Sequence, residues 1–210
     1  MFRATFLLFF LVAGASSAAW AEKNAPLEPK IAKTGSPVLS ESFDSPLAPP
    51  MVGVKGRWKV TDGNLVGAEL AADKHAAVLN VQQQNRNSVV RFSFKADGNT
   101  SGLNLSMNHA KGHLFRVVAT PSGISIVLDK DKKDPNSKPV VLATAKGELA
   151  SGQWHTLQLE IVGDRVLAMT DNGLIAEASH PSLDVDKPNY RFVMKGDSLT
   201  IDDLQIWDVK

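Results

Sequence analysis

Polar side chains that alternate with apolar ones are the residues of this sequence best placed to bind a ligand. On an extended strand, successive side chains point to opposite faces, so apolar neighbours that turn inward leave these polar groups on the outer face. Amide, hydroxyl, carboxylate and guanidinium groups supply hydrogen-bond donors and acceptors for the hydroxyl groups of a ligand. We expect one binding face formed by Arg91, Asn104, Ser106, Asn108, Arg116, Gln158 and Glu160.

An aromatic ring beside such a face would add a stacking surface. The candidates for this role are Trp154, Tyr190 and Trp207, which lie at the ends of predicted strands. A second interpretation stays open, because a sheet that is buried on one face exposes its other face to solvent. In that interpretation the polar residues form an ordinary solvated surface.

Histidines could hold a metal ion only together with further ligands. His109 and His113 have an H-x-x-x-H spacing, which on a helix would place both imidazoles on one side. The residues between them, Ala110, Lys111 and Gly112, are typical of a hairpin turn, and no third ligand is apparent, so the sequence predicts no metal site. Because G-x-S-x-G and G-x-G-x-x-G are also missing, we predict neither a serine nucleophile of that type nor a cofactor.

The overall composition narrows the function classes. The chain has 210 residues, with 23 Lys and Arg against 22 Asp and Glu, a formal net charge of +1 and no Cys. The near-zero charge argues against a nucleic-acid binder that acts through a basic surface. The absence of Cys excludes disulfide scaffolds, thiol catalysis and Cys-ligated zinc. A hydrophobic content of 43% is enough for a packed core.

The N-terminal region is predicted to be a secretory signal peptide over residues 1–21. Arg3 precedes a short apolar run, and small residues lead to Ala19-Trp20-Ala21. The apolar run is much shorter than the roughly 20 residues that span a bilayer, so we expect cleavage and no membrane span afterwards. We expect a secreted or periplasmic protein, with a disordered linker at residues 22–37 and one β-sandwich domain at residues 38–210.

The elements that must position the polar residues are short strands. Runs with period-two alternation are separated by turn signals such as Asp62-Gly63-Asn64 and Asp171-Asn172-Gly173. The pattern predicts an all-β fold of two packed antiparallel sheets. We predict about fourteen strands, at Leu39–Phe43, Trp58–Thr61, Leu65–Leu70, Ala76–Val81, Ser88–Ala96, Leu103–Asn108, Leu114–Thr120, Ile124–Asp129, Val140–Thr144, Trp154–Val162, Val166–Asp171, Leu174–Ser179, Tyr190–Lys195 and Leu199–Trp207.

Several of these segments resemble one known group of sandwiches. The stretch from Gly56 to Leu65, GRWKVTDGNL, is similar to the G-x-W-x-V-x-D-G-x-L hairpin of 3-keto-disaccharide hydrolase-like domains, in the concanavalin A-like lectin/glucanase superfamily. Glu41–Asp44, Thr100–Leu103 and Gln153–Gly173 are similar to further segments in the same order. The resemblance implies a concanavalin A-like jelly-roll sandwich in which Trp58 and Trp154 fill the core.

The chain departs from the catalytic patterns that this resemblance implies. Laminarinase-like relatives carry E-x-D-x-x-E on one strand, because retaining hydrolysis needs two carboxyl groups about 5 Å apart. No such triplet occurs here, and the strand after Gly102 lacks the arginine that the hydrolase-like domains usually carry. The acidic pairs Asp129/Asp131 and Asp184/Asp186 lie in Lys- and Pro-rich segments typical of solvated loops. The catalytic residues are therefore unknown.

Two function classes remain, beside a third possibility, a purely structural envelope protein whose sheet face binds no ligand. The first is an exported carbohydrate-recognition, lectin-like domain that is non-catalytic and binds a glycan. The alternative is a glycoside hydrolase of the 3-keto-disaccharide hydrolase type with a divergent active site. A pocket with converging histidine and carboxylate groups would favour the enzyme, whereas a shallow polar groove with an exposed aromatic ring would favour binding.

Overall fold

The computed structural model describes residues 27–209. The predicted signal peptide at 1–21 and the first part of the predicted linker, 22–26, lie outside the described residues. Within the described range nearly all regular structure is β-strand, with two short 3₁₀ helices, η1 (Ala71–Asp73) and η2 (Pro181–Leu183). No helix in this part of the chain is long and apolar enough to span a bilayer.

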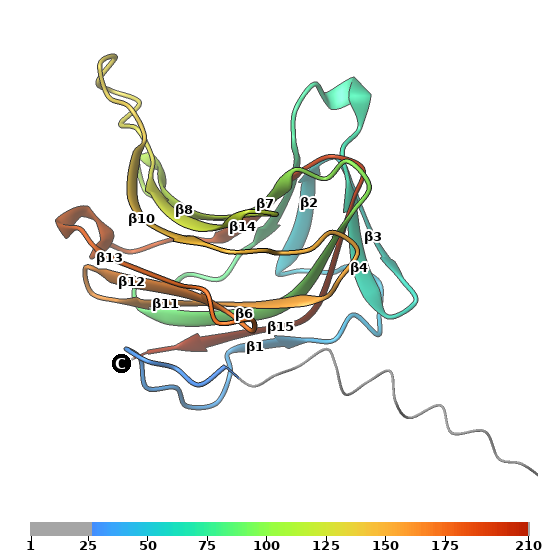
Figure 1. Cartoon of the computed structure of the whole chain (residues 1–210), viewed down its shortest axis with the longest axis horizontal. Coiled ribbons are helices and arrows are strands. Elements are labelled where there is room, and N and C mark those ends of the chain that lie inside the picture. Colours follow the sequence, from blue (N-terminus) through green and yellow to red (C-terminus); the bar gives the residue numbers. More distant parts are fainter. Residues whose placement is uncertain (1–26, 210) are drawn as a thin grey trace, which may run out of the picture.

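Two antiparallel sheets form the molecule, as the sequence predicted (Figure 1). The strands of sheet A are β1 (Leu39–Glu41), β3 (Arg57–Thr61), β4 (Asn64–Ala68), β6 (Ser88–Asp97), β11 (His155–Val162), β12 (Arg165–Thr170), β13 (Ile175–Ser179) and β15 (Ser198–Asp208). The strands of sheet B are β2 (Met51–Lys55), β5 (Ala77–Val81), β7 (Gly102–His109), β8 (Gly112–Thr120), β9 (Gly123–Leu128), β10 (Val140–Lys146) and β14 (Tyr190–Lys195).

The strand order explains which segments meet. Sheet A runs β13-β12-β11-β6-β15-β4-β3, with β1 on β15, and sheet B runs β10-β9-β8-β7-β14-β5-β2. Strand β14 therefore lies between β7 and β5, although it follows them by many residues in the sequence. This non-local pairing is what brings distant polar side chains onto one face of sheet B.

Each of the fourteen predicted strands has a counterpart, and one strand was missed. The missed strand is β2, which follows Pro49 and Pro50, contains Gly53 and has a register irregularity between Gly53 and Lys55. Val52 and Val54 are exposed, because β2 is an edge strand with little to pack against. Proline, glycine and a bulge remove the alternation that identifies a strand.

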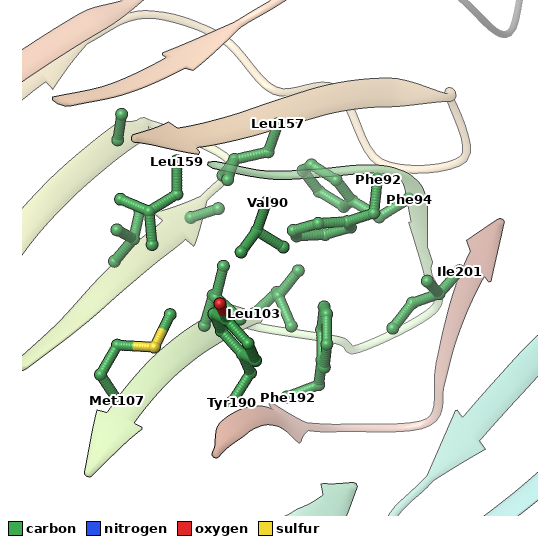
Figure 2. Packing of buried hydrophobic residues seen from close by; sticks show 14 of the residues in the cluster. Val90, Phe92, Phe94, Leu103, Met107, Leu157, Leu159, Tyr190, Phe192 and Ile201 are labelled. Atoms are coloured by element: carbon green, nitrogen blue, oxygen red, sulfur yellow. The ribbon is translucent and has the colours of Figure 1, made fainter. Parts of the chain in front are cut away.

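The core lies between the two sheets and consists of the inward-facing apolar residues of both. In β7 the inward residues are Leu103, Leu105 and Met107, as their alternation predicts, and all three are buried. Phe92 of sheet A meets Phe192 of sheet B edge to face, with ring centroids 5.0 Å apart (Figure 2). Such contacts hold the sheets together without a disulfide.

The tryptophans predicted to fill the core behave differently from each other. Trp58 packs against the core while half-buried, with its ring lying over Gly67, where an added Cβ would come within 2.5 Å of the ring. Trp154 is outside the core cluster, and Lys95 Nζ lies 5.9 Å from its ring centroid. Its core role was wrong, because the residue precedes β11 instead of lying within the strand.

Part of the predicted disordered linker is bound to sheet A. The carboxylate of Glu160, which is fully buried, accepts hydrogen bonds from the backbone N–H groups of Lys30, Ile31 and Ala32 at 2.8–3.0 Å. Gln158 Nε2 also donates to Glu160 Oε1, at 3.2 Å. The disordered-linker prediction therefore fails for this segment, since three consecutive amides are held by one buried acceptor.

Candidate functional site

The outer face of sheet B is hollow and carries the candidate site. In Figure 1 the sheet curves as the upper layer, and the loops around η1 and between β9 and β10 rise on its open side. A groove of about 290 Å³, here called the sheet B groove, lies on this face. Its lining residues are His75, Asn104, Ser106, His113, Arg116, Asp129, Arg191 and Val193.

Strand register places three of these residues in one row. Ser106 of β7 is directly opposite Arg116 of β8 on one side and Arg191 of β14 on the other. Because neighbouring strands are about 4.8 Å apart, the two arginine backbones are about 10 Å apart across the serine. The row therefore presents two guanidinium groups with a hydroxyl between them.

Arg116 and Asp129 form an ion pair at one end of the row. Asp129 directly follows β9, and its backbone N–H donates to Leu114 O at 2.8 Å, which fixes the residue beside β8. The Asp129 side chain is only 12% exposed and that of Arg116 27%. The carboxylate thus orients the guanidinium group and neutralises its charge.

At the other side of the row, His113 connects two strands. Its Nδ1 lies 3.0 Å from an Nη of Arg191 and 2.9 Å from Oδ1 of Asn108. Asn108 Nδ2 in turn donates to Asn189 Oδ1 at 3.1 Å. A guanidinium group can only donate, so Nδ1 accepts from Arg191 in the tautomer protonated at Nε2 and donates to Asn108 in the other.

Burial and neighbouring positive charges determine the protonation states of His113 and of the two arginines in the row. Burial, followed by the charges of Arg191, Lys132 and Arg116, lowers the pKa of His113, so the imidazole is neutral at pH 7. Burial also lowers the pKa of Arg116 and of Arg191, although both remain charged at any physiological pH. The two arginines of the row are thus cationic, and the neighbouring His113 is neutral.

A second groove continues from the first and shares His113 and Asp129 with it. This groove has a volume of about 280 Å³ and is lined by the loop between β9 and β10, the β7–β8 hairpin and the segment around η2. We call it the lysine groove, because its lining includes Lys111, Lys130, Lys132 and Lys138. The long, charged loop that sequence analysis interpreted as merely solvated therefore forms one wall of the candidate site.

Comparison with known proteins identifies the fold. No protein-family model matches the sequence, and no curated protein sequence matches it either. Solved structures do match: the carbohydrate-binding module CBM66 from Bacillus subtilis superposes with a TM-score of 0.61 and 13% sequence identity, covering 75% of this chain and 95% of that chain.

Two enzymes give similar values. SCLam, described as a non-specific endo-beta-1,3(4)-glucanase from family GH16, has a TM-score of 0.59 and 16% identity, covering 87% of this chain and 95% of its own. Porphyranase B from Zobellia galactanivorans has a TM-score of 0.57 and 11% identity, covering 80% and 91%. The chain has the concanavalin A-like jelly-roll fold. At these identities the likeness concerns the fold alone.

The jelly roll brings four of the seven predicted site residues together and separates the other three. Asn104, Ser106 and Arg116 line the sheet B groove, and Asn108 contacts its histidine. The remaining three lie on sheet A, on the opposite side of the molecule, and are Arg91, Gln158 and Glu160. The prediction that all seven residues share a single face was wrong, because β6 and β11 pair with each other and not with β7 or β8.

The three residues on sheet A already have partners. Arg91 donates to Gln205 Oε1 at 2.6 Å and lies 5.0 Å from the Trp207 ring centroid. Glu160 accepts the amides of the N-terminal segment and the amide of Gln158. These groups hold this face of the jelly roll together.

None of the three aromatic candidates lies in either groove. Tyr190 is fully buried in the core, because it is an inward residue of β14. Trp207 contacts Arg91 on sheet A, and Trp154 lies near Lys95 on the same sheet. The residues lining the sheet B and lysine grooves include no Phe, Tyr or Trp.

Sequence reasoning missed Arg191, Asp129, His113 and His75 as site residues. Arg191 could have been found, because alternation with the buried Tyr190 and Phe192 places it on the outer face of β14. Its position beside Ser106 could not, since that depends on the pairing of β14 with β7. Across the β7–β8 hairpin His109 pairs with Gly112 and His113 pairs with Asn108, and the described residues include no cluster of three or more possible metal ligands.

Proposed function

We propose that the protein is an exported, lectin-like carbohydrate-binding protein that is non-catalytic, and that a glycan binds in the sheet B groove. The row of Arg116, Ser106 and Arg191 on the floor of an open groove carries this proposal. Asn104, next to the row, adds an amide. These groups together offer the donors and acceptors that sugar hydroxyl groups need.

The proteins that share the fold support a carbohydrate ligand by analogy. CBM66 is described as a carbohydrate-binding module and SCLam as an endo-glucanase. A fold alone does not determine function, so the proposal depends on the residues of the groove.

The carboxylates of the grooves favour binding over hydrolysis. Asp129 is the one carboxylate among the residues lining the sheet B groove, and it is ion-paired with Arg116. In the lysine groove, Asp131 accepts a hydrogen bond from the backbone N–H of Lys133, which ties it to its own loop. Two-carboxylate glycoside hydrolysis needs one free acid and one free base or nucleophile flanking the same bond.

The alternative is a glycoside hydrolase of the 3-keto-disaccharide hydrolase type, as the sequence resemblance implies. The observation in its favour is His113, whose lowered pKa leaves a neutral imidazole in the groove that could accept a proton. Turnover of a sugar would therefore depend on His113.

The signal peptide predicted at residues 1–21 gives the proposed location, which is secreted or periplasmic. The same location gives the groove access to extracellular polysaccharides. Nucleic acid is not a proposed partner. The proposal includes no cofactor.

A glycan array and a hydrolysis screen on the same protein preparation test this function. We expect binding of at least one glycan class by the unchanged protein, loss of that signal in Arg116→Ala, and no product from oxidised or unoxidised disaccharides. Arg165→Ala is the matched control, because Arg165 is an exposed arginine of sheet A that is also ion-paired with a carboxylate. Product formation that His113→Gln abolishes would replace the proposal with the hydrolase alternative.

A further inference from the structure

Arg191 is a half-buried cation without a carboxylate. In the part of the chain that the structure describes, its side chain makes one hydrogen bond, to the neutral His113, and no ion pair. Arg116, by comparison, has Asp129. Removing a guanidinium group from water is costly unless an anion or several acceptors compensate, and burial lowers the pKa of Arg191 accordingly. A bound anion would supply the missing compensation.

Positive charge also accumulates around Arg191. The two grooves together are lined by six cationic side chains, of which two are arginines and four are lysines, and by two carboxylates, Asp129 and Asp131. The local excess of four positive charges contrasts with the formal charge of +1 for the whole chain. The near-neutral composition therefore hides a strongly basic surface on one face. A concave, basic surface raises the local concentration of anions.

The grooves lack the features that would favour a nucleic acid. Proteins that bind single strands stack the bases on aromatic side chains. No Phe, Tyr or Trp lines either groove, whereas hydroxyl and amide groups lie directly between and beside the arginines. This combination of cations and sugar-type hydrogen-bonding groups fits an acidic polysaccharide.

We propose that the glycan bound in the sheet B groove is anionic, with a carboxylate or sulfate group held by Arg191 and the neighbouring sugar hydroxyls held by Ser106 and Asn104. This inference rests on the proposed function and adds the ligand class to it. The lysine groove extends the site, so that a longer chain with several charges contacts Lys130 and Lys132 as well. Carboxylate and sulfate share the chemistry that arginine recognises in bidentate form.

Two matched pairs of polymers test the inference and distinguish a carboxylate ligand from a sulfate ligand. The first pair is polygalacturonate and its carboxyl-reduced, neutral form; the second is dextran sulfate and dextran. Affinities are measured by isothermal titration calorimetry at low and high salt. We expect the acidic member of at least one pair to bind at least about tenfold more tightly than its neutral partner, with affinity decreasing as salt increases.

Variants connect the affinity to the groove. Arg191→Gln is expected to weaken binding of the acidic polymer by about 10- to 100-fold, because one charge-assisted hydrogen bond is lost. Lys130→Gln/Lys132→Gln, which changes two exposed side chains of the loop between β9 and β10, is expected to weaken binding by about threefold or more. Arg57→Gln, an exposed arginine on β3 of sheet A, removes the same charge and is expected to leave the affinity unchanged.

Each outcome decides between the inference and the proposed function. If the neutral and acidic members bind equally tightly and Arg191→Gln weakens the binding of both, the ligand is not specifically anionic. That result would overturn the inference and leave the proposed carbohydrate binding intact. Acidic binding that Arg57→Gln reduces as much as Arg191→Gln would show non-specific attraction and overturn the inference. Tighter binding of single-stranded DNA than of either acidic polymer would also overturn it. Absence of binding to all four polymers and to the glycan array would overturn both.

Discussion

Arg116 and Arg191 are in register on opposite sides of Ser106, and only one of the two arginines has a carboxylate partner. The two residues lie on β8 and β14, 75 positions apart in the sequence numbering. Their different pairing is the basis for the different roles proposed for them. Arg116 is oriented by Asp129, whereas Arg191 has its charge available to a ligand.

The first prediction compares Arg116 with Asn104 in binding. For a glycan identified on the array, Arg116→Ala is expected to weaken binding by about 1.5–3 kcal/mol and Asn104→Ala by about 0.5–1.5 kcal/mol, since charged donors make the stronger hydrogen bonds. Isothermal titration calorimetry on the two variants measures this difference. Equal losses, or a larger loss for Asn104→Ala, would place the main contact elsewhere.

A control is needed because Arg116→Ala leaves Asp129 without its partner. The double variant Arg116→Ala/Asp129→Asn removes both charges of the ion pair and is expected to recover part of the stability that Arg116→Ala loses. The double variant should still bind the glycan weakly. Recovery of affinity together with stability would show that Arg116 acts only through the fold.

The second prediction concerns pH and His113. Its pKa in the folded protein is lowered by burial and by Arg191, Lys132 and Arg116, relative to about 6.5 in the unfolded chain. Between the two values the unfolded chain binds more protons, so the contribution of His113 to stability is fully present above about pH 6.5 and is lost as pH falls through the folded pKa.

An NMR titration of the imidazole resonances measures this directly. We expect the titration midpoint of His113 to lie below pH 6.5. As pH is lowered just below 6.5, we expect the free energy of unfolding to decrease less for His113→Gln than for the unchanged protein. A midpoint at or above 6.5 would mean that the imidazole has an anionic neighbour in the free protein.

The third prediction tests the attachment of the N-terminal segment to sheet A. Glu160→Gln replaces one carboxylate oxygen by an NH₂ group that faces the backbone donors of Lys30–Ala32 and the amide of Gln158. We expect a loss of about 1–3 kcal/mol in the free energy of unfolding and faster hydrogen exchange at those three amides.

Glu177→Gln is the matched control for Glu160→Gln. Glu177 is an exposed glutamate of the same sheet that pairs with Arg165. Its replacement should change stability by about 0.5 kcal/mol or less. Unchanged exchange at residues 30–32 in Glu160→Gln would show that the segment is held by other contacts.

The fourth prediction concerns the packing of Trp58 on Gly67. A methyl group at Gly67 would lie 2.5 Å from the Trp58 ring, so Gly67→Ala is expected to destabilise the protein by about 1–3 kcal/mol. Gly35→Ala is the control, because an added Cβ there meets nothing within 4 Å. Chemical denaturation of both variants measures the difference. A neutral Gly67→Ala would mean that the ring moves away at little cost.

The sequence predicts the local structure of this protein better than its long-range pairing. Alternation of Leu103, Leu105 and Met107 with polar residues was enough to place Asn104 and Ser106 on the outer face of β7. The same reasoning failed for Arg91 and Glu160. Their strands also alternate, but period two gives the face of a strand within its own sheet and does not say which sheet the strand joins.

Charge shows the same limit. Asp129 was interpreted as a solvated loop charge, because a Lys- and Pro-rich segment follows it. Its ion pair with Arg116 depends on the hydrogen bond that continues the β8–β9 ladder by one residue, from the amide of Asp129 to Leu114 O. The basic character of the grooves was likewise invisible in a formal charge of +1, since Asp129 and Asp131 are the only acidic residues among those that line the grooves.

The most direct test of the central claim, that the sheet B groove is the glycan-binding site, is an NMR titration of the arginine Nε–Hε resonances with an acidic oligogalacturonide. We predict saturable shifts for Arg191 and Arg116 and none for Arg91 or Arg165, which lie on sheet A. Shifts confined to Arg91 and Arg165, with Arg191 and Arg116 unchanged at saturation, would contradict the account.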